Sequence, residues 1–104
     1  MQIQYDNGEV ITKISPTSRG LRFLRVEETI YLASSDETTH VDIKIRCKLD
    51  LDQVIDAGFI RGFEAGDIVL YGRSSGLKIG NEGSNERRET ARILTEVTGQ
   101  EVGL

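Results

Sequence analysis

Cysteine is almost absent from this chain of 104 residues, and its single copy, Cys47, excludes an intrachain disulfide and a metal site built from several thiolates. No run approaches the roughly 20 apolar residues that a helix needs to span a bilayer. The first six residues lack a basic segment followed by an apolar core, so no secretory signal is predicted. We therefore expect a cytoplasmic protein without a membrane partner.

Histidine is equally scarce, because His40 is the only one in the chain. Cys47 would lie on the opposite face of an extended segment from His40, so a Cys–His catalytic pair is not expected. We expect His40 at the surface and Cys47 in the core. Asp50, Asp52 and Asp56 are close in sequence but lack the glycine and closing glutamate of a calcium loop, so no metal is predicted. The sequence thus favours neither an enzyme nor a cofactor.

Composition indicates one globular domain that spans residues 1–104. The chain is 38% hydrophobic and 29% charged, which is typical of a folded protein and not of a disordered one. Its formal net charge of −4 argues against a dedicated nucleic-acid-binding protein, whose surface is usually basic. Aromatic residues for base stacking are also few, with three tyrosines, three phenylalanines and no tryptophan.

The clearest pattern in the chain is a strict alternation of polar and apolar residues over 40–49. Val41, Ile43 and Ile45 fall on one face with Cys47, whereas the basic residues fall on the other. A strand sends successive side chains to opposite faces, so this pattern predicts a long, half-buried strand with a basic outer surface.

The rest of the chain alternates between strand signals and turn signals. Asp6-Asn7-Gly8 predicts a tight turn, and Asp50 and Gln53 sit in the capping-box positions of a short helix that ends at Gly58. Ser84 or Asn85 caps a second helix, from about Glu86 to Thr98, with Gly99 as its end. We expect the last residues of the chain to be frayed. The predicted strands are Gln2–Tyr5, Glu9–Ser15, Leu21–Glu27, Thr29–Ala33, Asp67–Arg73 and Leu77–Gly80, in addition to 40–49. Leu21–Glu27 and Thr29–Ala33 could instead be one strand with a bulge at Glu27-Glu28.

These elements predict an α+β fold. We expect a mostly antiparallel curled sheet or small open β-barrel of about six to seven strands, with a short middle helix and a C-terminal helix. Thr90, Ile93, Leu94 and Val97 should form the buried stripe of the C-terminal helix.

Two groups of basic residues are candidate binding sites. Lys44, Arg46 and Lys48 would project from one strand face and, together with Arg22, could form a basic stripe that binds nucleic acid. The same stripe could instead be a solvated face or a protected sheet edge.

The second candidate is the glycine-rich segment 72–84, which leads into a helix start. Arg73, Lys78, Arg87 and Arg88 could hold a phosphate, another anion or a nucleotide there. The spacing matches neither a P-loop nor the dinucleotide fingerprint, and local carboxylates such as Glu86 and Glu89 could balance the arginines instead.

The leading functional prediction is a non-enzymatic binding or assembly module that acts through a sheet face or edge. Several strands with few residues to cover them leave edges that another chain can pair, so we expect a protein partner or a homo-oligomer. A small nucleic-acid-binding barrel and an anion- or nucleotide-binding domain are the alternatives.

Overall fold

The computed structural model describes residues 2–5, 10–11, 20–34, 38–62 and 67–104. The predicted turn at 6–8 lies outside these residues, as does most of the predicted strand Glu9–Ser15. The elements are β1 (Gln2–Tyr5), β2 (Val10–Ile11), β3 (Leu21–Val26), β4 (Thr29–Ser34), α1 (His40–Arg46), the short 3₁₀-helix η1 (Leu51–Gln53), β5 (Asp56–Arg61), β6 (Ile68–Tyr71), α2 (Asn85–Thr98) and β7 (Val102–Gly103).

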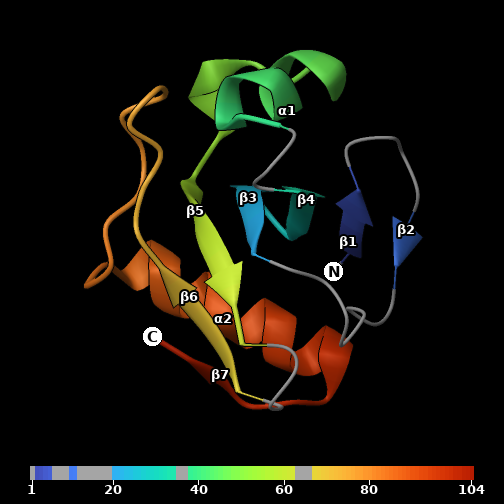
Figure 1. Ribbon diagram of the computed structural model, residues 1–104, viewed down its shortest axis with the longest axis vertical. Coiled ribbons are helices and arrows are strands. Elements are labelled where there is room, and N and C mark those ends of the chain that lie inside the picture. The colour runs from blue at the N-terminus through green and yellow to red at the C-terminus, as the bar shows by residue number, and fades with distance from the viewer. Residues whose placement is uncertain (1, 6–9, 12–19, 35–37, 63–66) are drawn as a thin grey trace.

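The strands form one curled sheet in the order β2-β1-β4-β3-β5-β6-β7 (Figure 1). The β1–β4 and β6–β7 pairs are parallel, and the other pairs are antiparallel. Helix α2 connects the parallel strands β6 and β7, as a parallel pair requires a long crossover. The predicted α+β class is therefore confirmed, and the sheet is mixed instead of purely antiparallel.

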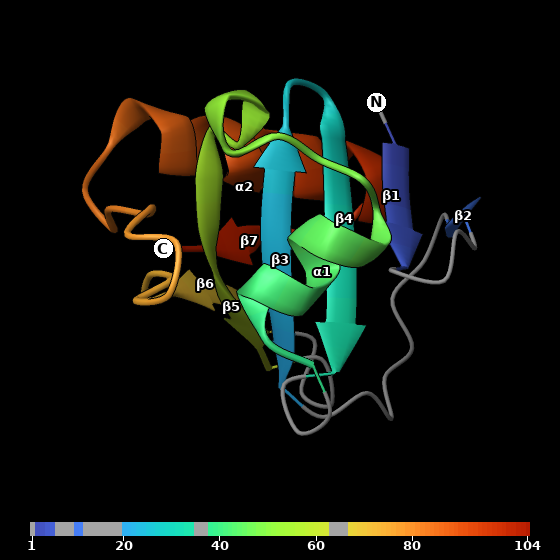
Figure 2. The same cartoon turned by 90° about the horizontal axis from the view of Figure 1, so that it is seen from above.

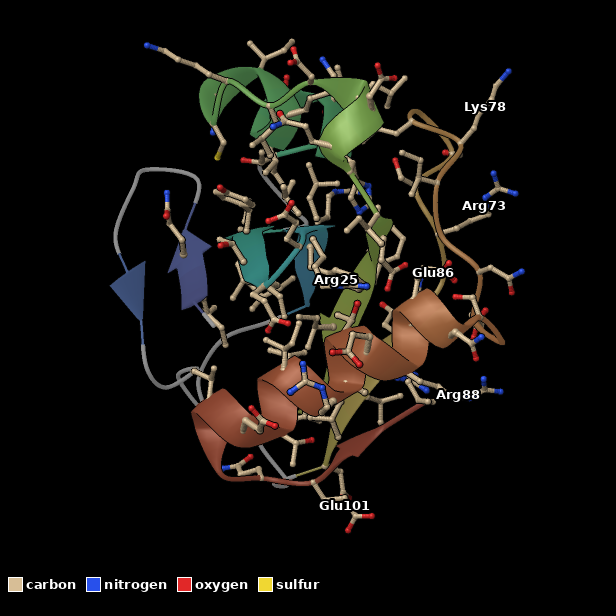
Figure 3. The ribbon with its side chains drawn as sticks, turned by 180° about the vertical axis from the view of Figure 1, so that it is seen from behind. Arg25, Arg73, Lys78, Glu86, Arg88 and Glu101 are labelled. Atoms are coloured by element: carbon tan, nitrogen blue, oxygen red, sulfur yellow. The ribbon has the colours of Figure 1, made fainter. Side chains whose placement is uncertain are left out.

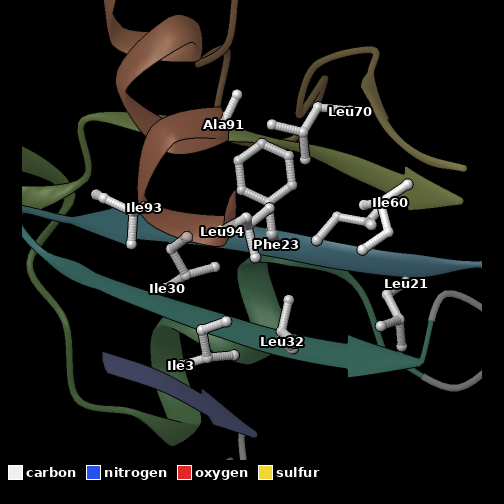
Figure 4. Close-up of a cluster of buried hydrophobic side chains, with 11 residues drawn as sticks. Ile3, Leu21, Phe23, Ile30, Leu32, Ile60, Leu70, Ala91, Ile93 and Leu94 are labelled. Carbon is white, nitrogen blue, oxygen red and sulfur yellow. The ribbon is translucent and has the colours of Figure 1, made fainter. Parts of the chain in front are cut away.

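The two helices lie on opposite sides of the sheet (Figure 2). Between α2 and the sheet lies the larger hydrophobic cluster, which includes Phe23, Ile60 and Leu94 (Figure 4). A smaller cluster under α1 contains Leu24, Ile43 and other apolar residues. Cys47 packs against this smaller cluster and is half-buried. The helices therefore cover much of both sheet faces.

The prediction that 40–49 is a strand is wrong, because His40–Arg46 is helix α1. Thr39 and Asp42 form a capping box, in which the Asp42 amide donates to Thr39 Oγ1 and the Thr39 amide donates to Asp42 Oδ2, both at 3.2 Å. The helix buries His40 and Ile43, whereas Ile45 is 63% exposed. The capping box and the burial of His40 and Ile43, three residues apart on one helix face, thus favour a helix here, although the residues alternate as in a strand.

Three further expectations also need correction. The helix expected between Asp50 and Gly58 is only the 3₁₀ turn η1, after which the chain is extended as β5. The strand expected at 77–80 reduces to one antiparallel bridge between Ser74 and Ile79. The last residues, which we expected to fray, pair with β6 through β7.

The β3–β4 hairpin and helix α2 agree with the sequence predictions. Ser84 caps α2 by accepting a hydrogen bond from the Arg87 amide at 3.1 Å, and Gly99 ends the helix in the left-handed conformation. Thr90, Ile93 and Leu94 are buried on its inner face, and Val97 packs against the same core.

A network of buried polar side chains crosses this core. Arg87, in the first turn of α2, is fully buried and pairs with Asp56 of β5 at 2.9 Å from Nε to Oδ2. Thr90 Oγ1 donates to Asp56 Oδ2 at 2.8 Å, and Arg25 Nε donates to Thr90 Oγ1 at 2.8 Å. Three elements, β3, β5 and α2, are thereby joined by charge-assisted hydrogen bonds in a region shielded from water.

We expect Asp56→Ala to destabilise the fold strongly. It leaves the Arg87 charge buried without its carboxylate, and breaking such a pair costs about 3–5 kcal/mol of the free energy of unfolding. Urea denaturation measures this loss. Asp52→Ala, at an exposed carboxylate of η1, is the control and should barely change the midpoint. Similar midpoints for the two variants would contradict the structural role of the pair.

Candidate anion-binding pocket

A pocket of about 290 Å³ lies where β3, β5, the start of α1 and the segment after β6 meet. This volume is near the lower end of the range for ligand sites, so the pocket fits a small ligand or the end group of a larger one. Its lining residues include Arg22, His40, Phe59, Arg73 and Ser75. Arg73 is exposed, and its side chain extends outward from the rim of the pocket (Figure 3). Among the described residues that line it there are two arginines and no carboxylate.

A hydrogen bond from its imidazole ring holds His40 in the pocket wall. It is 4% exposed, and its Nε2 lies 2.8 Å from the carbonyl oxygen of Gly58 on β5. A carbonyl can only accept a hydrogen bond, so Nε2 carries the proton and Nδ1 carries a lone pair. The expectation that His40 lies at the surface is therefore wrong, and it followed from the strand prediction for 40–49.

Burial lowers the pKa of His40 from its usual value of 6.5. The Gly58 carbonyl acts in the opposite direction, since it favours the protonated ring, and the positive charge of Arg22 lowers the pKa further. His40 is consequently neutral at pH 7 and keeps the Nδ1 lone pair.

Aromatic rings extend from the pocket across β5 and β6. The Phe59 ring is met edge-on by His40, at 5.2 Å between centroids, and Arg22 lies 5.0 Å above it. Tyr71, the partner of Phe59 across β5 and β6, stacks on Phe59 at 5.5 Å, and Arg61 lies 5.1 Å from the Tyr71 ring. The arginines thus pack on apolar rings beside the pocket.

Position 58 has no room for a side chain, so glycine is required there. A Cβ atom there would lie 2.8 Å from the Tyr71 carbonyl oxygen, 2.9 Å from Arg87 Nη2 and 3.0 Å from the Phe23 ring. Any larger residue would therefore displace the strand whose carbonyl holds His40.

The four residues of the predicted basic stripe lie on different elements of the structure. Arg22 lines the pocket from β3, whereas Lys44 and Arg46 belong to α1 and Lys48 follows that helix. The Arg46 guanidinium donates to Thr38 Oγ1 at 3.3 Å, and Lys48 is exposed. These four residues do not share a strand face.

The predicted anion group is also divided. Arg73 lines the pocket, whereas the Arg87 guanidinium is buried against Asp56, a carboxylate that the sequence analysis did not connect with it. Lys78 and Arg88 are exposed, and Arg88 donates to Asn85 (Figure 3). The pocket therefore combines one residue from each predicted group, Arg22 and Arg73.

Sequence reasoning missed His40 and Phe59 as pocket residues. Thr39 followed by Asp42 at the capping-box spacing could have indicated a helix that begins at His40. Nothing local to Phe59 or Gly58 indicates that β5 lies beside the start of α1.

The chain was compared with known protein families, curated proteins and solved structures, and no significant match was found. None of the helices in the described ranges is long and apolar enough to cross a bilayer. The candidate site therefore rests on its own geometry.

Because the pKa of His40 is low in the folded state, we expect the free energy of unfolding to decrease as the pH is lowered. Its pKa in the folded state lies below the unfolded value of 6.5, so the unfolded chain takes up the proton first as the pH falls. The free energy of unfolding should decrease below pH 6.5 and level off once folded His40 is protonated. Urea denaturation at several pH values measures this, with His40→Gln as the variant that lacks the titration. Parallel pH profiles for the two chains would contradict it.

Proposed function

We propose that this chain is a binding module for a phosphate-bearing ligand, with the site in the pocket between Arg22, His40 and Arg73. The observation that supports it is that two arginines and a neutral histidine line one small pocket whose described lining residues include no carboxylate. Two guanidinium groups match the charge of a phosphate dianion, and their planar donors suit its oxygens. This narrows the anion-binding alternative to one pocket.

Each lining group has a definite part in this proposal. Arg22 and Arg73 donate to the phosphate oxygens and neutralise their charge. The hydroxyls of Thr39 and Ser75 supply neutral donors at the pocket wall. His40 Nδ1 accepts a hydrogen bond from a singly protonated phosphate, or faces its phosphorus atom.

We expect Arg22→Gln and Arg73→Gln each to weaken phosphate binding about 10- to 100-fold, because each removes a charge-assisted hydrogen bond. NMR titration with inorganic phosphate measures the dissociation constant. Arg88→Gln is the matched control, since it removes an exposed positive charge that does not line the pocket.

Three outcomes decide this proposal. Loss of affinity in the two pocket variants alone supports it. An equal loss in Arg88→Gln contradicts it and moves the site to the start of α2. Absence of phosphate binding by the parent chain also contradicts it.

The state of His40 favours a second candidate, phosphoryl transfer. A neutral imidazole whose Nε2–H donates to a carbonyl keeps a lone pair on Nδ1, and this lone pair can act as a nucleophile. Nδ1 forms a bond to phosphorus while the bond from phosphorus to the leaving oxygen breaks, and that oxygen takes the electron pair and a proton from water. A water molecule then attacks phosphorus and displaces Nδ1, which releases phosphate and restores the ring. Arg22 and Arg73 would stabilise the charge on the phosphoryl oxygens in both steps.

If this candidate is correct, His40→Asn abolishes hydrolysis of 4-nitrophenyl phosphate but retains phosphate binding, since the arginines remain. Release of 4-nitrophenolate measures the first property and the NMR titration the second. The matched variant Arg88→Gln should hydrolyse the ester at the parent rate. Hydrolysis by His40→Asn at the parent rate, or none by the parent, would exclude His40 as the nucleophile.

Self-association through a sheet edge and binding of nucleic acid stay predictions. The geometry gives them less support, since the end strands β2 and β7 have two residues each, which is short for edge pairing. Lys44, Arg46 and Lys48, on which the nucleic-acid alternative depends, are not on a strand.

A further inference from the structure

Arg87 makes contacts that its pairing with Asp56 alone does not require. Its Nη2 atom lies 3.2 Å from Asp56 Oδ1 and also donates to two backbone carbonyls. These are the carbonyl of Ala57, at 3.0 Å, and that of Gly72, at 2.8 Å. One buried nitrogen therefore joins β5 to the segment that follows β6.

This bridge lies where the strand pairing ends. The β5–β6 register runs from Arg61 and Val69 to Phe59 and Tyr71. Ala57 and Gly72 lie beyond its last pair, so the guanidinium connects the two chains past the end of the recorded register.

Both carbonyls adjoin the walls of the pocket. Ala57 precedes Gly58, whose carbonyl accepts the hydrogen bond from His40 Nε2. Gly72 precedes Arg73, which lines the same pocket. The residue that orients His40 and the residue that carries a pocket charge are thus each one position from an Arg87 acceptor.

We propose that Arg87 is a positioning residue of the pocket: by holding the Ala57 and Gly72 carbonyls together, it fixes His40 relative to Arg73. This inference rests on the proposed phosphate site and assigns Arg87 no contact with the ligand. A lysine would keep a positive charge near Asp56, but its single ammonium lacks the planar fork that serves the carboxylate and both carbonyls.

Arg25 supplies a matched control because it belongs to the same buried network. It is 4% exposed, and it donates to Thr90 and to the carbonyls of Glu27 and Glu86. Unlike Ala57 and Gly72, none of these three acceptor residues directly precedes a residue that orients His40 or lines the pocket, among the residues that the structure describes. Arg25→Lys therefore disturbs the core without releasing the pocket walls.

The experiment compares Arg87→Lys with Arg25→Lys under conditions in which urea denaturation shows both to be folded. Imidazole ¹⁵N shifts report the tautomer of His40, and NMR titration reports phosphate affinity. We expect Arg87→Lys to move the His40 shifts towards a mixture of tautomers and to weaken phosphate binding at least about tenfold. Arg25→Lys should leave both close to the parent values.

Equal changes in the two variants, or unchanged His40 shifts and affinity in Arg87→Lys, would overturn the proposal. A parent chain that binds no phosphate would overturn the proposed function, whereas the His40 shifts would still decide whether Arg87 positions that ring. If Arg87→Lys does not fold, phosphate is added to the parent chain. The Arg87 Nε–H resonance should then shift and that of Arg25 should not, and the opposite result would refute the inference.

Discussion

The buried pair between Arg87 and Asp56 is the interaction on which this fold and its pocket depend. Placing two charges in the core is costly, and the structure offsets the cost with a side-on pairing, the Thr90 hydroxyl and two backbone carbonyls. These partners come from β5, from α2 and from the chain after β6. The same contacts therefore hold the helix to the sheet and define where the pocket walls stand.

The pocket shows how a chain with a net charge of −4 can still bring two arginines to one cavity. Arg22 and Arg73 come from distant parts of the sequence and line one small cavity. None of the described residues that line this cavity is acidic. Local potential differs from net charge for this reason. His40 completes the lining: burial favours its neutral ring, and the hydrogen bond from Nε2 to the Gly58 carbonyl fixes the tautomer.

Local signals in the sequence were sufficient for α2 and for the extended segments of β3 and β4, since caps and apolar periodicity act over a few residues. They left open whether β3 and β4 form a hairpin or one bulged strand, and the structure has the hairpin. They misled at 40–49, where a capping box and the burial of His40 and Ile43 prevailed over a strict alternation. The Asp56–Arg87 pair spans 31 residues and has no local signature. The pocket was partly predicted, because Arg22 and Arg73 were both candidates, but they belonged to separate hypotheses. Only the tertiary fold brings them together with His40.

The most direct test of the proposed phosphate site is to locate a phosphate analogue bound to the protein. Anomalous diffraction from crystals soaked in tungstate, with its strongly scattering metal, locates the oxyanion without assumptions about the ligand. We expect a single strong peak between Arg22 and Arg73, beside Nδ1 of His40. A peak at the start of α2 near Arg88, or no peak in the pocket, would contradict it.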